Sequence, residues 1–234
     1  MRISLTSDVP FHERRDWFDD AELVRHATAC IAAQREAASA ARAAFVPHPQ
    51  AADQVSPEAL QRILDAGDDI HGIASDHSIS NVISFNAKHL QSAVDSDAVA
   101  ALRRKVDTLV SQKLRETFEG GDSLTVTCSG HFWYPPGGYM GWHTNNGAPG
   151  WRIYLTHSAE PGKSFFRYRL PADGRIVTST DQSWDIRLFR IDPQRPLWHA
   201  VHSQTDRFSL GYVVHAKRPL HALAGKLKGL VGGR

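Results

Sequence analysis

Two patterns of apolar and polar residues divide the chain near residue 120. Up to that point, apolar positions recur every three to four residues over long runs, which is typical of amphipathic helices. Beyond it, short runs rich in β-branched and aromatic residues alternate with turn signals such as Pro135-Pro136-Gly137-Gly138. The change predicts a mainly helical N-terminal region over 1–120, a β-rich core over 121–216 and a basic tail over 217–234.

Capping signals predict two helices in the first third of the chain. Asp19 and Asp20 stand before the alanine-rich run 21–45, where an acidic side chain can cap the first backbone N–H groups. Ser56 and Pro57 then give a cap followed by proline at the first helical position. We expect this second helix to end at Gly67.

A third, longer helix is predicted from Asp97 to Phe118. Its apolar residues fall on one stripe, so we expect it to pack along a sheet face; they are Val99, Leu102, Val106, Leu109, Leu114 and Phe118. Partial alternation over 79–85 predicts a strand before it.

The second half of the chain is predicted to be an antiparallel sandwich or barrel. Its strands are short and follow one another closely, which argues against a βαβ fold. The predicted strands are 124–134, 151–157, 164–170, 175–180, 183–191, 197–203 and 207–215. The pair Asn146-Gly147 is read as a structural turn.

Composition narrows the class of protein. Hydrophobic residues make up 41% and charged residues 22% of the chain, which is typical of a soluble globular protein. The net charge of +2 indicates no general attraction to nucleic acid, and no apolar run suits a signal peptide or a membrane span. Cys30 and Cys128 are expected to be reduced, buried residues of a cytoplasmic protein. Thirteen histidines raise the expectation of a metal site.

Candidate chemistry gathers in two segments. A loop rich in Pro and Gly delivers His143 to a strand end, and much later His199 ends another β-rich run. Arg207 and Ser209 open the next run and alternate onto the same strand face. If that face is buried, the guanidinium needs an anionic partner, and a ligand carboxylate suits its planar fork.

The order of these residues resembles the Fe(II)/2-oxoglutarate-dependent dioxygenases, over roughly 124–214. His143 matches the family's first histidine, His199 its distal histidine, and Arg207-Phe208-Ser209 its Arg-x-Ser arrangement. The resemblance implies an α+β fold with a double-stranded β-helix core, jelly-roll or cupin-like, behind an N-terminal helical buttress. It further implies Fe(II) on the two histidines and 2-oxoglutarate held by Arg207 and Ser209. Tyr154 is either a hydroxyl donor to this cosubstrate or a core residue.

Asn145 departs from the family pattern, which has a carboxylate two residues after the first histidine. Several outcomes are open. Asn145 could be a weak metal ligand, the site could leave a position for water or an anion as in the family's halogenases, or the metal could be lost. A carboxylate from elsewhere, such as Asp185, could also complete the site.

Other polar residues have competing interpretations. His202 rivals His199 as the distal ligand, but its gap to Arg207 is shorter and it faces the opposite side of the strand. Arg152 could hold an acidic substrate or pair with an acid at the surface. The remaining strand histidines are read as packing or surface residues; they are His131, His157 and His215. A solvated face, with an anionic-substrate surface as the alternative, is expected for Arg167, Arg169, Arg175, Arg187 and Arg190.

By this resemblance the expected activity is oxidation with molecular oxygen, most simply hydroxylation of a small molecule or a peptide side chain. 2-Oxoglutarate would be converted to succinate and carbon dioxide. The alternatives are a halogenase-like or other non-hydroxylating oxidase, and a non-catalytic cupin-like binding protein without metal. No nucleic-acid or membrane partner is expected.

Overall fold

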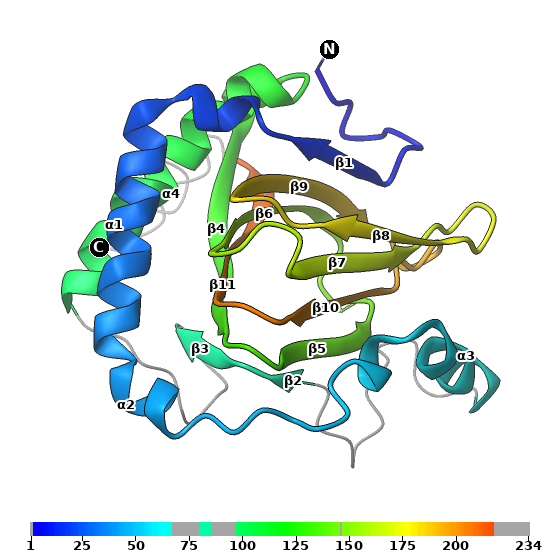
Figure 1. Cartoon of the computed structure of the whole chain (residues 1–234). Helices are drawn as coiled ribbons and strands as arrows, with labels where there is room; N and C mark the ends of the chain where they lie inside the picture. The colour runs from blue at the N-terminus through cyan, green and yellow to red at the C-terminus, as the bar shows by residue number, and fades with distance from the viewer. Residues whose placement is uncertain (1, 67–79, 86–96, 146, 218–234) are drawn as a thin grey trace, which may run out of the picture.

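A computed structural model of the chain describes residues 2–66, 80–85, 97–145 and 147–217. Two long helices cover one side of a pair of facing β-sheets, and a shorter helix lies on the other side (Figure 1). None of the described helices is long and apolar enough to cross a membrane. The predicted helix stop at Gly67, Asn146 of the predicted turn, and the basic tail from Arg218 onward lie outside the described residues.

The helices begin where the capping signals predicted. The helix α1 spans Ala21–Ala37, and the Asp20 carboxylate accepts the backbone N–H groups of Glu22 and Leu23. A short continuation, α2, spans Ser39–Ala43. The helix α3 spans Pro57–Ala66, with the Ser56 hydroxyl accepting the Ala59 N–H. Short 3-10 turns cover Asp16–Asp19, Asp53–Val55 and Gly121–Ser123.

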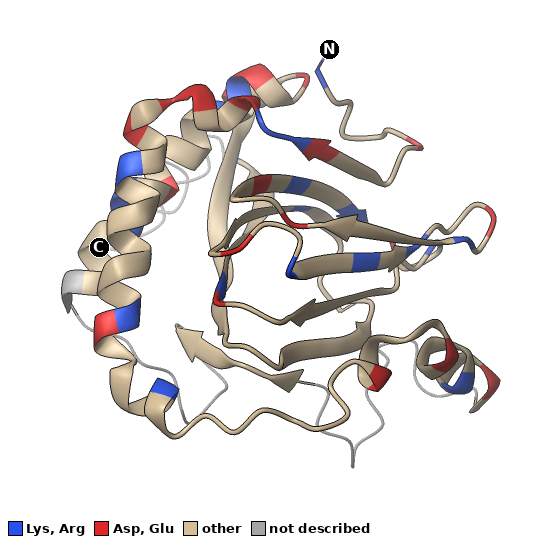
Figure 2. Cartoon of the chain, viewed as in Figure 1, with Lys and Arg blue, Asp and Glu red and all other residues tan. Residues whose placement is uncertain are grey.

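The long helix α4 spans Asp97–Thr117 and buries its apolar stripe, as predicted. Leu109, Val110 and Leu114 pack with α1 residues against the outward face of a β-sheet. The N-terminal helices therefore buttress the sheet. Lys, Arg, Asp and Glu are interspersed along α1 and the N-terminal segment (Figure 2).

The strands form two antiparallel sheets with crossed connections. Eight core strands are β4 (Leu124–Tyr134), β5 (Gly138–His143), β6 (Gly150–Ser158), β7 (Ser164–Arg169), β8 (Ile176–Thr180), β9 (Trp184–Ile191), β10 (His199–Ser203) and β11 (Arg207–Ala216). One sheet has the order β9-β6-β11-β4 and the other β5-β10-β7-β8, with further strands at the edges. Every connection between successive core strands crosses to the other sheet except the one between β7 and β8, which pair within one sheet. This arrangement is the double-stranded β-helix predicted for the core.

The N-terminal region also contributes strands to both sheets. β1 (Phe11–Arg14) pairs with β9 and was not predicted. The strand expected over 79–85 is split in two: β2 (Ser80–Asn81) pairs with β5, and β3 (Ile83–Phe85) pairs with β4 in the other sheet.

Alternation along β6 and β11 separates two environments. Ile153, Leu155 and Leu210 face the helices and join the main apolar core. Tyr154 on β6 and Arg207 on β11 point to the opposite face, into the space between the sheets. There Tyr154 packs on Phe189 and Arg207 contacts Asp181. The polar residues of the candidate site therefore line the barrel interior.

Candidate active site

The two histidines predicted to bind metal face each other across neighbouring strands. His143 is the last residue of β5 and His199 the first of β10, and the two are direct partners in the antiparallel register. Their ring centroids are 4.1 Å apart. Both side chains are buried, at the end of the barrel where β5 finishes and β10 starts.

Backbone carbonyls fix which nitrogen of each ring carries the proton. The Nδ1 of His143 lies 2.8 Å from the Gly141 carbonyl oxygen, and the Nδ1 of His199 lies 2.9 Å from that of Leu197. A carbonyl only accepts, so each Nδ1–H donates. Burial lowers the pKa of His143, and burial together with the neighbouring His143 holds the pKa of His199 well below its usual value. Both rings are therefore neutral at neutral pH, with a lone pair on Nε2.

Asn145 joins this pair from the turn after β5. Its backbone is left-handed, with φ 58°, a conformation that asparagine tolerates better than most residues. Its Nδ2 lies 3.1 Å from the His199 Nε2 and donates to that lone pair. The three residues predicted as metal ligands are thus brought together by the fold.

The chemistry of this donor set fits a divalent transition metal. Two neutral imidazole nitrogens suit iron, zinc or copper, and the Asn145 amide could offer its oxygen after a half-turn. Among the described residues, no group of three or more His, Cys, Asp or Glu side chains is placed to hold a metal ion. Asp185 does not complete the site, because its carboxylate accepts hydrogen bonds from the Arg15 Nε and the Gln182 backbone N–H.

His202, the rival for the distal position, lies on the other face of β10. Its ring centroid is 5.7 Å from that of Phe165, and its direct neighbour in β5 is Tyr139. Burial lowers its pKa as well. Because side chains alternate along a strand, only His199 can meet His143 inside the barrel.

A cavity of about 490 Å³ opens beside the histidine pair. It is lined by Ser129, Phe132, Met140, His143, Asn145, Gly147, Ala148, Arg152, Tyr154 and Val213. Its volume falls within the roughly 300–1,000 Å³ of ordinary ligand pockets. Burial raises the pKa of Tyr154, and the guanidinium groups of Arg152 and Arg207 act against that rise. Tyr154 therefore lines the cavity within electrostatic reach of both arginines.

Arg207 lies at the opposite end of the barrel interior from the histidine pair. β10 runs from His199 to Ser203, roughly 13 Å at the usual strand rise, before the turn that leads to Arg207. The guanidinium is fully buried over the Tyr134 ring, with Cζ 4.9 Å from the ring centroid. Ser209 follows on the same strand face, opposite Thr156 of β6.

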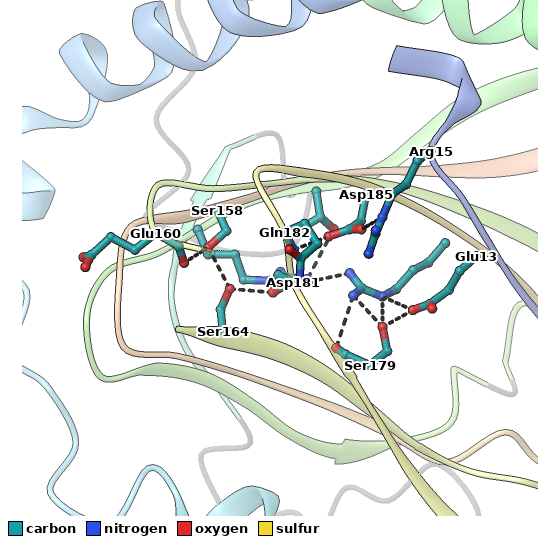
Figure 3. A network of polar contacts seen from close by, with 12 residues as sticks. Glu13, Arg15, Ser158, Glu160, Ser164, Ser179, Asp181, Gln182 and Asp185 are labelled. Carbon is teal, nitrogen blue, oxygen red and sulfur yellow. Dashed lines mark hydrogen bonds and ion pairs between the residues drawn. The ribbon is translucent and has the colours of Figure 1, made fainter. Parts of the chain in front are cut away.

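Arg207 was expected to pair with a ligand carboxylate, but a protein carboxylate, Asp181, already pairs with it. The Asp181 carboxylate, just after β8, accepts the Arg207 Nε–H at 2.8 Å and the Ser164 hydroxyl at 2.5 Å. It also accepts the Arg187 Nη1–H at 2.5 Å. Figure 3 shows Asp181 at the centre of this network, with Ser164 on one side and Ser179 on the other.

Arg187 corrects the prediction of a solvated arginine face. It is fully buried on β9, where the Ser179 hydroxyl also accepts from it and the Glu13 carboxylate lies 3.5 Å from its Nε. Burial would raise the pKa of Asp181, but Arg207 and Arg187 outweigh it and keep that pKa below its usual value. Sequence reasoning missed Asp181. The signal was present in two arginines at inward positions of β9 and β11, two strands of one sheet, which together require a buried carboxylate.

Arg207 nevertheless keeps one free donor. Its Nη2 lies 3.3 Å from the Thr156 hydroxyl, while its Nη1 is buried without a hydrogen-bond partner in the part of the chain that the structure describes. An unpaired buried guanidinium N–H is a costly arrangement that a bound carboxylate oxygen would relieve. The residues at this end of the barrel therefore fit the far carboxylate of 2-oxoglutarate.

Comparisons with known proteins give distant structural likenesses. No protein-family model matches the chain, and no curated protein matches it. A prolyl-4-hydroxylase of Pseudomonas putida is 15% identical, over 89% of this chain and 93% of that chain, with a TM-score of 0.42. A prolyl hydroxylase of Trichoplax adhaerens, solved with a peptide fragment of hypoxia inducible factor, is 13% identical over 81% and 84%, with a TM-score of 0.37.

A third similar structure is an oxidoreductase of the 2OG-Fe(II) oxygenase family from Burkholderia pseudomallei. It is 12% identical, over 71% of this chain and 84% of that chain, with a TM-score of 0.39.

Proposed function

We propose that this protein is a non-haem Fe(II), 2-oxoglutarate-dependent oxygenase that hydroxylates its substrate. One observation carries the proposal: the two ends of a single barrel interior hold complementary binding groups. At one end, two neutral histidines present Nε2 lone pairs beside Asn145. At the other end, the buried Arg207 keeps an N–H that no described residue accepts. A molecule that both chelates a metal and carries a remote carboxylate matches this arrangement.

Each residue of the site has a defined role in this proposal. His143, His199 and Asn145 would hold Fe(II), while Arg207, Ser209 and Tyr154 would bind 2-oxoglutarate. When bound, Fe(II) and 2-oxoglutarate would together supply oxygen activation, coupled to decarboxylation of 2-oxoglutarate to succinate and carbon dioxide.

Neighbouring groups keep these side chains in place. The Phe166 and Phe189 rings lie 5.4 Å and 5.2 Å from the His199 ring and exclude water from its faces. Asp181 fixes the Arg207 guanidinium through Nε, so its free Nη1 needs little reorganisation to receive a carboxylate. The protein therefore contributes positioning and electrostatics.

An anaerobic titration tests this function directly. Purified protein is mixed with Fe(II), and 2-oxoglutarate is added while the metal-to-ligand charge-transfer absorption is recorded. We expect the band in the wild type and in His202→Ala, which removes a histidine from the other face of the same strand. We expect no band in His143→Ala or His199→Ala. Absence of the band in the wild type, with no succinate formed in air, would overturn the proposal.

The Asn145→Asp variant tests the third ligand. If Asn145 touches the iron, an anionic oxygen in its place should tighten Fe(II) binding, because two imidazoles leave both metal charges uncompensated. Competition with a fluorescent chelator measures the change. Unchanged affinity would place Asn145 outside the coordination sphere.

A metal-free binding protein is the second candidate function. The observation that favours it is the hydrogen bond from the Asn145 amide to the His199 Nε2, which engages a ligand lone pair without any metal. This candidate predicts that Fe(II), Co(II) and Zn(II) all fail to bind, while small ligands still enter the cavity. Chloride-dependent turnover of an iron-loaded protein would instead identify a halogenase-like oxidase.

A further inference from the structure

Arg152 is the only formally charged residue among the described residues that line the cavity. The others are two polar side chains, neutral His143, Tyr154, and small or apolar residues. The cavity wall that the structure describes therefore presents one positive charge and no negative charge beside the histidine pair.

Arg152 is buried, and no acidic side chain among the described residues pairs with its guanidinium. It lies near the start of β6, only 3% exposed, and its Nη2 donates to the carbonyl oxygen of Ala148. Its Nη1 is buried without a hydrogen-bond partner, and the structure records no ion pair for it among the described residues. A buried guanidinium without an anion is strongly unfavourable, in contrast to Arg187 and Arg207, which share Asp181.

The charges of the loaded site do not balance without a further anion. Arg207, Arg187, Asp181 and Glu13 form a group that is neutral overall. In the cavity, a divalent ion and Arg152 would bring three positive charges, and 2-oxoglutarate would bring two negative charges. Asn145 is neutral, where the family's pattern has an acid. One positive charge is left.

We propose that the substrate is a small organic acid or amino acid whose carboxylate is bound by Arg152. This inference rests on the proposed function, whose substrate class it specifies. Arg152, which lines the cavity, would hold the carboxylate through a guanidinium N–H, while the rest of the molecule lies against Phe132, Met140 and Val213. A carboxylate bound there receives a charge-assisted hydrogen bond.

The register separates Arg152 from the site proposed for the cosubstrate. On β11, Arg152 lies opposite Val213 and Ser158 lies opposite Arg207. Arg207 and Val213 are six residues apart on one strand, roughly 20 Å between Cα atoms. The two arginines thus approach the interior from opposite ends, so one carboxylate at each is geometrically reasonable.

The first experiment measures carboxylate binding in the metal-free full-length protein. Benzoate is the probe, and benzamide is the neutral control of the same shape; their affinities are compared by ligand-observed NMR titration. We expect the wild type to prefer benzoate by at least about tenfold, the range of a hydrogen bond to a charged group. Equal affinities in the wild type would overturn the proposal without any variant.

Two variants assign the preference to Arg152. Arg152→Gln should abolish the preference for benzoate, and Arg152→Lys should retain part of it because the charge remains. Arg190→Gln is the matched control, since Arg190 is a partly exposed strand arginine that pairs with Asp192. Retention of the full preference in Arg152→Gln would overturn the proposal.

A second arm separates substrate from cosubstrate. The affinity of the Co(II)-loaded protein for 2-oxoglutarate is measured by calorimetry in the wild type and in Arg152→Gln. Unchanged 2-oxoglutarate affinity alongside lost benzoate preference supports a substrate carboxylate. A tenfold or greater loss of 2-oxoglutarate affinity would mean that Arg152 serves the cosubstrate. Failure of Co(II) and 2-oxoglutarate to bind at all would refute the proposed function, whereas the change in benzoate preference between the wild type and Arg152→Gln reports on Arg152.

Discussion

The buried carboxylate Asp181 offers the sharpest test of how the barrel interior is stabilised. The perturbation is Asp181→Asn, which keeps the shape of the side chain and removes its charge. The carboxylate oxygens accept from Arg207, Arg187 and Ser164, and all three acceptor contacts lie within 2.8 Å. An amide has only one accepting oxygen, so the variant loses hydrogen bonds. Because the amide is also neutral, the variant leaves two buried guanidinium groups without an anion between them.

The size of the effect follows from burial. Asp181, Arg187 and Arg207 are all buried to 1% exposure or less at the side chain. Breaking such a pair by removing one partner typically destabilises a protein by about 3–5 kcal/mol. For a chain of this size, where 1 kcal/mol shifts the melting temperature by about 2–4 °C, we expect Tm to fall by about 6–20 °C.

Urea unfolding followed by tryptophan fluorescence measures the change in the free energy of unfolding. Asp192→Asn is the control, because Asp192 forms a long ion pair with Arg190, at 3.9 Å near the surface, and its loss should stay within about 0.5 kcal/mol. The double variant Asp181→Asn, Arg187→Met should lose less than the sum of the single variants, since it removes one excess charge. A loss below about 1 kcal/mol in Asp181→Asn would refute the reasoning, because that is the range of an exposed pair.

Two further predictions concern the helix–sheet layer. Burial, with Arg103 nearby, lowers the pKa of His131 to about 3. On acidification, this histidine is therefore protonated in the unfolded chain while it stays neutral in the folded chain. Stability should therefore fall as pH drops below about 6.5, and His131→Gln should reduce the loss between pH 7.5 and 5.0 by about 2 kcal/mol in urea unfolding. Asp20→Ala removes the cap of α1 and should lower stability by about 1 kcal/mol in the same assay. Asp19→Ala, which removes no such cap, should have little effect.

Local signals predicted most of the elements. The caps at Asp20 and Ser56 and the apolar stripe of α4 depend on residues close together in the sequence, and each helix begins where its signal predicted. The β-rich runs became strands for the same reason. β1 was missed because Phe11–Arg14 is short, and only pairing with β9 makes it a strand. β5 was read as part of a loop because Pro135-Pro136-Gly137 precedes it and its sequence contains two glycines, although His143 was expected at a strand end.

The pairing register of β5 and β10 brings the two predicted histidines together. His143 and His199 were chosen from the resemblance and from spacing, and the pairing of β5 with β10 places them directly opposite each other. Their metal, and the roles of Ser209 and Tyr154, stay predictions. Arg187 was placed wrongly because alternation tells only that a residue lies on one of two faces. Which face is buried depends on the second sheet.

The sequence by itself determined the order of elements, the faces of the helices and strands, and the residue types able to bind a metal and a carboxylate. These follow from short-range periodicity and from the chemistry of single side chains. The tertiary structure alone decided the charge partners. Asp181 forms an ion pair with Arg207, which lies 26 residues further along the chain. Arg152 forms no ion pair with an acid among the described residues. Such pairings depend on which strands the two sheets bring face to face, because the electrostatic interaction of buried groups is set by distance and burial in space.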